Sequence, residues 1–182
     1  MWKRILAIAL VCVSLTLQGC VASGGGLKAY INEFNGYEFL YPNGWVQIAV
    51  DKNNGPDVVF RDLIEESDLV SVVVSDIKGS EKNLSELGSP EEVGVRLAKN
   101  VLAPEGSGRQ AELVNASSRT LKDKEYYNFE YFISLPNAER HNLASVTVSR
   151  GKLFTLSIAS AESDWSQHEA TFKNVANSFS VY

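Results

Sequence analysis

The chain has 182 residues, of which 45% are hydrophobic and 21% are charged. This length and composition are typical of one globular domain with an additional terminal segment, and they exclude collagen-like, coiled-coil and wholly disordered chains. Because 17 Lys and Arg residues stand against 22 Asp and Glu residues, the formal net charge is −5, which argues against a nucleic-acid-binding protein.

The amino-terminal segment has the pattern of a bacterial lipoprotein signal peptide. Two basic residues precede an apolar run over residues 5–17, which as a helix covers about 20 Å, too short for a membrane core of ~30 Å. The run ends in Leu-Gln-Gly-Cys at residues 17–20, which resembles a lipobox, where processing attaches diacylglycerol to the cysteine sulfur and cleaves before it. We therefore predict a signal peptide over residues 1–19 and lipid attachment at Cys20. An ordinary secretory signal with an unmodified cysteine is the alternative.

Residues 20–29 are predicted to form a flexible tether, because they contain three consecutive glycines and show no periodicity. Each buried methylene group contributes about 0.8 kcal/mol to membrane binding, so two or more acyl chains anchor a protein durably. We expect the folded domain over residues 30–182, held close to a membrane surface.

Strand patterns dominate the first part of the predicted domain. Residues 37–41 and 45–50 flank Pro-Asn-Gly at 42–44, which has a turn composition, and together they predict a hairpin. Residues 58–62 and 69–75 predict the next two strands, with an acidic segment between them.

A helix is predicted to begin after Ser89. Pro90 suits the first turn of a helix, and Glu92 lies three residues after Ser89, as a capping box requires. Apolar residues follow at a spacing of four, and Pro104 ends the helix.

Four strand-like runs then predict a β-meander, at residues 111–120, 125–135, 141–150 and 152–159. The second run carries aromatic side chains on both faces, which indicates either a strand covered on both sides or an aromatic face offered to a partner. Because helices do not alternate regularly with strands, we expect an α+β fold with helices packed on an antiparallel β-sheet.

A final helix, capped by Ser163 or Asp164, is predicted to follow the meander. One apolar stripe runs along it at helical spacing. Its members are Trp165, His168, Phe172, Val175, Ala176 and Phe179.

The common catalytic sequence motifs are absent from the chain. No G-x-S-x-G elbow, phosphate-binding loop, dinucleotide-binding glycine motif or C-x-x-C pair occurs. Since two His, two Cys and one Met also leave little material for thiol or multi-histidine chemistry, we expect neither an enzyme nor a required cofactor.

Two histidines are candidate ligands for a divalent metal. His168 lies four residues after Asp164, which allows a two-ligand pair on one helix, and its alternative role is packing. His141 opens a strand, and a carboxylate from Glu162 or Asp164 could complete a Zn²⁺ or Mn²⁺ site with it; a solvated histidine is the alternative. Six acidic residues over 51–68 suit Ca²⁺ or Mn²⁺, although they lack EF-hand spacing and are also explained as a solvated face.

Five short segments resemble, in this order, those of the PsbP family. They are Gly-Trp at 44–45 behind a proline, residues 88–92, residues 126–128, residues 151–153 and residues 177–181. The resemblance covers roughly residues 30–182, and the lipobox points to the cyanobacterial lipoprotein form of the family. It implies an antiparallel sheet flanked by helices on both faces and a non-enzymatic role at photosystem II.

From this resemblance we expect a monomeric, lipid-anchored protein on the lumenal side of the thylakoid membrane. Its expected partners are lumenal subunits or assembly intermediates of photosystem II, whose oxygen-evolving complex it would help to assemble or stabilise. Plant members carry a longer amino-terminal segment associated with retention of Ca²⁺ and Cl⁻, so that function is not expected here. The resemblance also implies a metal at His141 with an acidic residue near Asp164. The alternative function is a metal- or small-ligand-binding lipoprotein that uses His141 or the crevice between sheet and helices.

Overall fold

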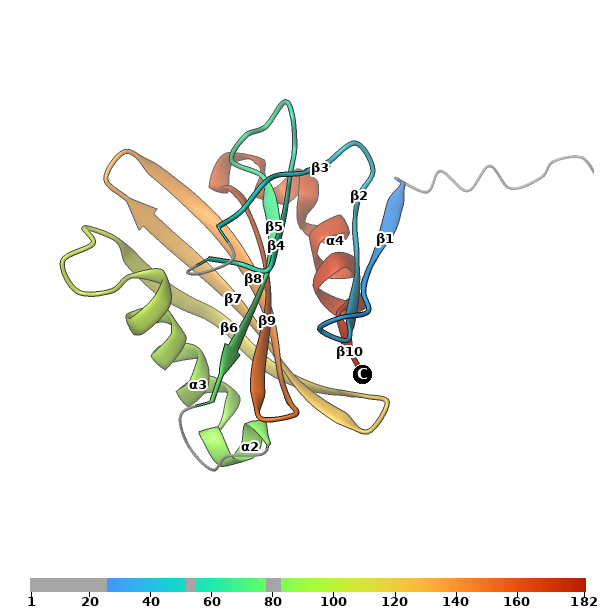
Figure 1. Cartoon of the computed structure of the whole chain (residues 1–182). Coiled ribbons are helices and arrows are strands. Elements are labelled where there is room, and N and C mark those ends of the chain that lie inside the picture. Colours follow the sequence, from blue (N-terminus) through green and yellow to red (C-terminus); the bar gives the residue numbers. More distant parts are fainter. Residues whose placement is uncertain (1–25, 52–54, 78–82) are drawn as a thin grey trace, which may run out of the picture.

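The computed structural model describes residues 26–51, 55–77 and 83–182 (Figure 1). The predicted signal peptide, Cys20 and the larger part of the predicted tether lie outside them. The strands are β1 (Leu27–Asn32), β2 (Tyr37–Pro42), β3 (Val46–Gln47), β4 (Val58–Arg61), β5 (Leu69–Asp76), β6 (Gln110–Leu121), β7 (Lys124–Leu135), β8 (Ala138–Ser149), β9 (Lys152–Ala161) and β10 (Ser180–Val181). The helices are α2 (Leu84–Leu87), α3 (Pro90–Leu97), the π-helical turn η1 (Ala98–Leu102) and α4 (Glu162–Ser178).

A seven-stranded antiparallel sheet with the order β3-β4-β5-β9-β8-β7-β6 forms the centre of the domain. The predicted meander is confirmed as β6–β9, whose neighbouring strands all pair along their length. Its three turns are two-residue loops, and in two of them, at 122–123 and 150–151, both residues have a positive φ. This is the backbone of a type I′ turn, whose twist matches that of long paired strands.

The predicted hairpin between residues 37–41 and 45–50 is wrong. Strand β2 instead pairs with β1 and β10 in a separate three-stranded sheet, whereas β3 pairs with β4 at the edge of the larger sheet. Residues 42–44 do form a turn, in which Gly44 adopts a φ of 96°, but this turn carries the chain from one sheet to the other. Strand β1 also begins at Leu27, so the last three residues of the predicted tether belong to the folded domain.

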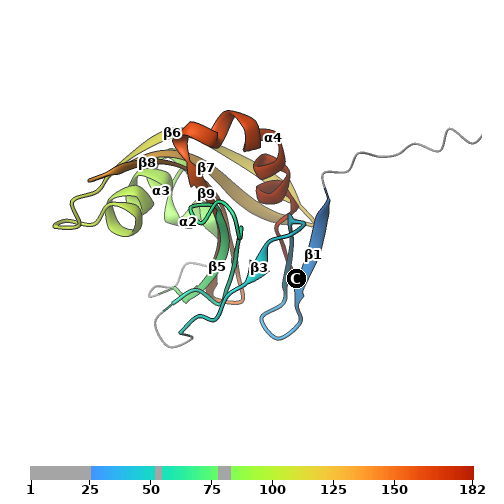
Figure 2. The ribbon, with the colours of Figure 1, turned by 90° about the horizontal axis from the view of Figure 1, so that it is seen from above.

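Both faces of the large sheet are covered (Figure 2). Helix α4 and the three-stranded sheet pack on one face, around a core that includes Tyr37, Phe154 and Phe172. Helices α2 and α3 pack on the other face over β6 and β7, around a core that includes Phe129 and Val146. The aromatic side chains of β7 are therefore divided between two cores, and the α+β fold with helices on both faces of an antiparallel sheet is confirmed.

The amino-terminal end of α3 follows the sequence prediction. The Ser89 hydroxyl accepts a hydrogen bond from the Glu92 backbone at 3.3 Å, and the Glu92 carboxylate accepts one from the Ser89 backbone at 3.0 Å. Further along α3, a Cβ at Gly94 would lie 2.9 Å from Leu113 of β6, so the missing side chain allows the helix to approach the sheet closely. The helix continues through η1 before it ends.

Helix α4 follows its prediction only in part. Its N-cap is Ala161, which has no capping side chain, so the predicted cap at Ser163 or Asp164 is wrong. The predicted stripe is buried at every position except His168, which is half-buried at its edge. Within the described ranges, no helix is both long enough and apolar enough to cross a membrane.

Candidate functional site

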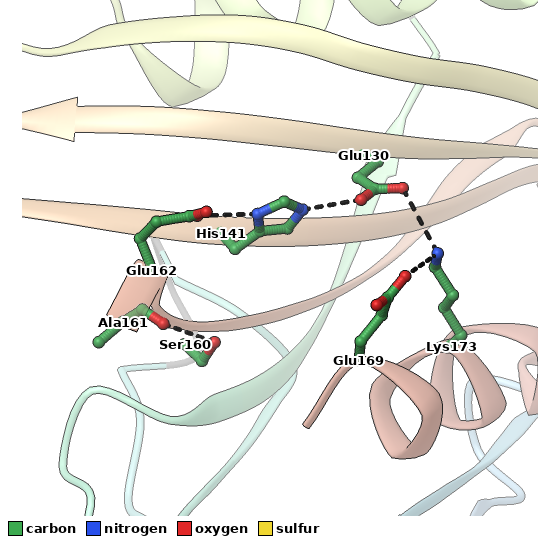
Figure 3. A network of polar contacts seen from close by, with 7 residues as sticks. All are labelled: Glu130, His141, Ser160, Ala161, Glu162, Glu169 and Lys173. Carbon is green, nitrogen blue, oxygen red and sulfur yellow. Dashed lines mark hydrogen bonds and ion pairs between the residues drawn. The ribbon is translucent and has the colours of Figure 1, made fainter. Parts of the chain in front are cut away.

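A row of ionisable side chains joins β7, β8 and α4 on the face of the sheet that α4 covers (Figure 3). His141 of β8, which is only 6% exposed, lies at its centre. The imidazole Nδ1 is 2.8 Å from a carboxylate oxygen of Glu162, and Nε2 is 2.9 Å from a carboxylate oxygen of Glu130. The predicted association of His141 with Glu162 is thus present, and Glu130 is an additional partner.

Local geometry explains why these side chains meet. In the β7–β8 register His141 lies opposite Phe132, so Glu130 is its diagonal neighbour on the same face of the sheet. Helix α4 begins at Glu162, and Trp165 lies three residues later on the same side of the helix. The indole of Trp165 stacks on the imidazole with 3.8 Å between ring centroids and 7° between ring planes.

Lys173 extends the row along α4. Its ammonium group is 3.9 Å from Glu130 and 2.5 Å from Glu169, one helical turn before it. The hydrogen bond from Lys173 lowers the pKa of Glu169, and the same bond raises the pKa of Lys173. A cavity of about 190 Å³ lies beside this part of the row, with Glu130 and Lys173 in its wall together with amide side chains such as Asn128 and Asn177.

The row does not have the form of a metal centre. Glu130 and Glu162 approach opposite nitrogens of His141, so a single ion could contact the imidazole and only one of the two carboxylates. Zinc sites in proteins usually have at least three protein ligands. Among the described residues, no group of three or more His, Cys, Asp or Glu side chains is placed to hold one ion. A site with only two protein ligands would bind a metal ion weakly, whatever the charge of those ligands.

The other two predicted ligands lie in a different place. His168 faces the buried carboxylate of Asp68 with Nε2 and Oδ2 3.8 Å apart, and its ring stacks on Phe172. Asp164 accepts a hydrogen bond from the Ser163 hydroxyl and interacts electrostatically with Asp68. Of the four predicted residues, only His141 and Glu162 are in contact, whereas His168 and Asp164 interact with Asp68. The predicted metal remains a prediction.

Asp68 should make the stability of the domain depend on pH. Desolvation raises the pKa of its carboxyl group, and the charges of Asp164 and Asp62 add to this, while Ser67 and His168 act against it. The folded protein then binds a proton more tightly than the unfolded chain, so stability falls as the pH rises from about 4, where an ordinary aspartate titrates. The free energy of unfolding of Asp68→Asn should therefore rise relative to that of the wild type as the pH increases from 3 to 7. Chemical denaturation at several pH values measures this difference.

Asp62→Asn is the matched control for this experiment. Hydrogen bonds from the backbone of Ile64 and Glu65 lower the pKa of Asp62, so its charged form stabilises the fold above that pKa. Asp62→Asn should become less stable relative to the wild type over the same pH interval. If both variants changed in the same direction, the assigned role of Asp68 would be wrong.

The sequence prediction missed two residues, Glu130 and Asp68, and the sequence contained a signal only for Glu130. Glu130 is a single carboxylate in an aromatic strand, and a two-residue turn at 136–137 fixes its position near His141. Asp68 was one of six acids in a polar segment, and nothing local indicates that it alone is 2% exposed beneath α4.

The comparisons with known proteins agree with this architecture. The PsbP family model matches residues 25–181. CyanoP of Thermosynechococcus vestitus is 48% identical, and CyanoP of Synechocystis sp. is 44% identical, each over the full length of both chains. The solution structure of CyanoP from Synechocystis sp. PCC 6803 superposes with a TM-score of 0.74, covering 92% of this chain and 99% of that one. The chain therefore belongs to the PsbP family, a family of extrinsic proteins associated with photosystem II.

Proposed function

We propose that this protein is a lipid-anchored accessory protein on the lumenal side of the thylakoid membrane, where it binds photosystem II or its assembly intermediates. The observation that carries the proposal is the similarity to two CyanoP proteins over the whole length of both chains. The role we propose is to assist assembly or stability of the oxygen-evolving complex. We further propose that it acts as a monomer and without a required cofactor.

The anchor gives this role a physical basis. A domain held to a membrane by acyl chains and a short tether samples only a thin layer beside that membrane. Its effective concentration at membrane-bound partners then rises, so that an interface of modest affinity is sufficient. Such a protein can associate with an assembly intermediate and later leave it.

A non-enzymatic role agrees with the polar row around His141. PsbP-family proteins are photosystem-associated and non-enzymatic. Each ionisable side chain of the row contacts another side chain of the same row, as expected of a structural element. The metal-binding alternative stays a prediction, for which zinc calorimetry on the wild type and on His141→Ala is the direct test.

The proposed function can be tested by fractionation and affinity purification in cyanobacterial cells that lack their own relative of this protein. With an affinity tag after Tyr182, we expect the wild type to remain on salt-washed membranes and, after mild solubilisation, to co-purify with photosystem II subunits. Cys20→Ser should lose the lipid and appear in the soluble fraction. Cys12→Ser, which changes the other cysteine of the chain, is the matched control and should behave as the wild type.

The two parts of the proposal can fail separately. Retention of Cys20→Ser on salt-washed membranes would contradict the lipid anchor. Absence of photosystem II subunits from the wild-type purification, with the protein still on the membrane, would contradict the proposed partner.

A further inference from the structure

Two adjoining cavities form a trough on the face of the sheet opposite α4. The first, of about 190 Å³, lies between η1 and the strands beneath it. Its apolar wall is formed by Val73, Leu97, Val101, Leu102, Tyr131 and Ala144. The second, of about 200 Å³, continues toward the beginning of β5 and shares Val101, Leu102 and Asn142 with the first. Together the two reach the lower end of the size range of small-molecule sites, roughly 300 Å³ upward.

The trough is open because the helices cover only part of this face. Helices α2 and α3 contact β6 and β7, and Figure 2 shows them on that side of the sheet. Over β5 the apolar surface stays accessible: Val73 is 39% exposed, and Val101 of η1 above it is 62% exposed. Apolar side chains exposed on both walls of one cavity favour an apolar occupant. The π-helical form of η1 is a rare conformation that often marks functional sites.

Two polar side chains on the floor of the trough, Asn142 and Ser157, are hydrogen-bonded to each other. Asn142 donates a hydrogen bond to Ser157 at 3.0 Å, and the Ser157 hydroxyl donates one back to the Asn142 amide oxygen at 3.2 Å. An apolar chain lying over this pair would leave neither group without a hydrogen bond, so these two side chains add little to the desolvation penalty of binding.

Two arginines lie at one end of the trough. Arg109 and Arg140 both line the second cavity, and the positive charge of Arg109 repels the guanidinium of Arg140. Arg140 donates to the backbone carbonyl of Ser67, but its buried Nε has no hydrogen-bond partner. In the part of the chain that the structure describes, neither arginine forms an ion pair with a carboxylate, although Asp68 acts on Arg140 at longer range. An anion at this end would relieve the repulsion and supply the missing acceptor.

We propose that the trough binds a medium-chain fatty acid, with its alkyl chain between η1 and the sheet and its carboxylate at Arg109 and Arg140. The distance along β5 from Val73 to Leu69 is about 13 Å, which suits an extended chain of this class. This inference goes beyond the proposed role at photosystem II, and it is tested on the isolated protein.

Calorimetric titration with octanoate and decanoate below their micelle-forming concentrations tests the proposal. Since each buried methylene group tightens binding about fourfold, decanoate should bind more than tenfold more tightly than octanoate. Decylamine, which carries the opposite charge on the same chain, should bind about tenfold more weakly than decanoate, because it cannot accept from the arginines. If neither acid binds, or if decylamine binds as well as decanoate, the proposal is wrong.

Variants at exposed positions locate the site without disturbing the fold. Val101→Glu places a carboxylate in the trough and should abolish decanoate binding, whereas Val95→Glu introduces the same change outside it and should not. Arg109→Gln should weaken binding of decanoate about tenfold, and Lys99→Gln, which removes a charge from η1, should leave it unchanged. Equal affinities within either pair would place the ligand elsewhere and overturn the assignment.

Discussion

Replacement of Trp165 by alanine should lower the free energy of unfolding by about 3–5 kcal/mol, the usual cost of removing a large aromatic side chain from a core. The indole is 8% exposed and stacks on His141. Its other neighbour is Phe172, one of the largest fully buried side chains of the domain. The substitution therefore opens a cavity between α4 and the sheet and also removes the surface on which the imidazole lies.

Chemical denaturation of the purified domain measures this effect. Trp165→Phe keeps an aromatic ring at the position and should lose less stability than Trp165→Ala. Phe34→Ala is the matched control, because Phe34 is 94% exposed and its loss should change stability by less than about 0.5 kcal/mol. A loss below about 1 kcal/mol in Trp165→Ala would show that α4 does not depend on this contact.

The elements that depend on local signals could be predicted from the sequence. The capping box at Ser89 involves residues three positions apart, and the meander turn at 150–151 is set by two adjacent residues. In both cases the backbone conformation is fixed by atoms that are close in the chain.

The three-stranded sheet could not be predicted in this way. Its third strand, β10, has two residues and pairs with β2 across about 140 positions of sequence. The composition of residues 42–44 indicates a turn, but it does not indicate with which strand the following segment pairs. The choice is made by burial, because Tyr37 and Phe39 of β2 pack with α4 in the core.

The candidate site also contains both contacts that local sequence signals indicate and contacts that depend on tertiary packing. Glu162 follows the strand next to His141, so their proximity could be expected from the meander alone. His168 and Asp68 meet only because α4 packs over the loop before β5, a tertiary arrangement without a local signal. The predicted contact of His141 with Glu162 is therefore present, whereas the partner of His168 is Asp68, which the prediction did not include.

Replacement of His141 by phenylalanine should lower the free energy of unfolding by about 2–3 kcal/mol, the upper part of the cost of leaving a buried polar group without its hydrogen-bond partner. Phenylalanine keeps a ring against Trp165 but donates no hydrogen bond. Glu130, whose side chain is 15% exposed, then keeps only the ion pair with Lys173 at 3.9 Å. Glu162 is 34% exposed and can be solvated, which is why most of the loss should come from Glu130.

A double variant separates the cost of leaving the Glu130 carboxylate without His141 from the cost of the other contacts that His141 makes. Combining His141→Phe with Glu130→Leu removes the carboxylate that has lost its hydrogen-bond partner. The double variant should therefore lose less stability than the sum of the two single losses, which a double-mutant cycle measures. Glu169→Gln, which alters the exposed end of the same row, should cost no more than about 0.5 kcal/mol, the usual contribution of an exposed ion pair one helical turn apart. If His141→Phe were as stable as the wild type, the two short hydrogen bonds would contribute nothing to the fold. Stability would then not explain why these side chains are held together, and contact with a binding partner would be the role to test.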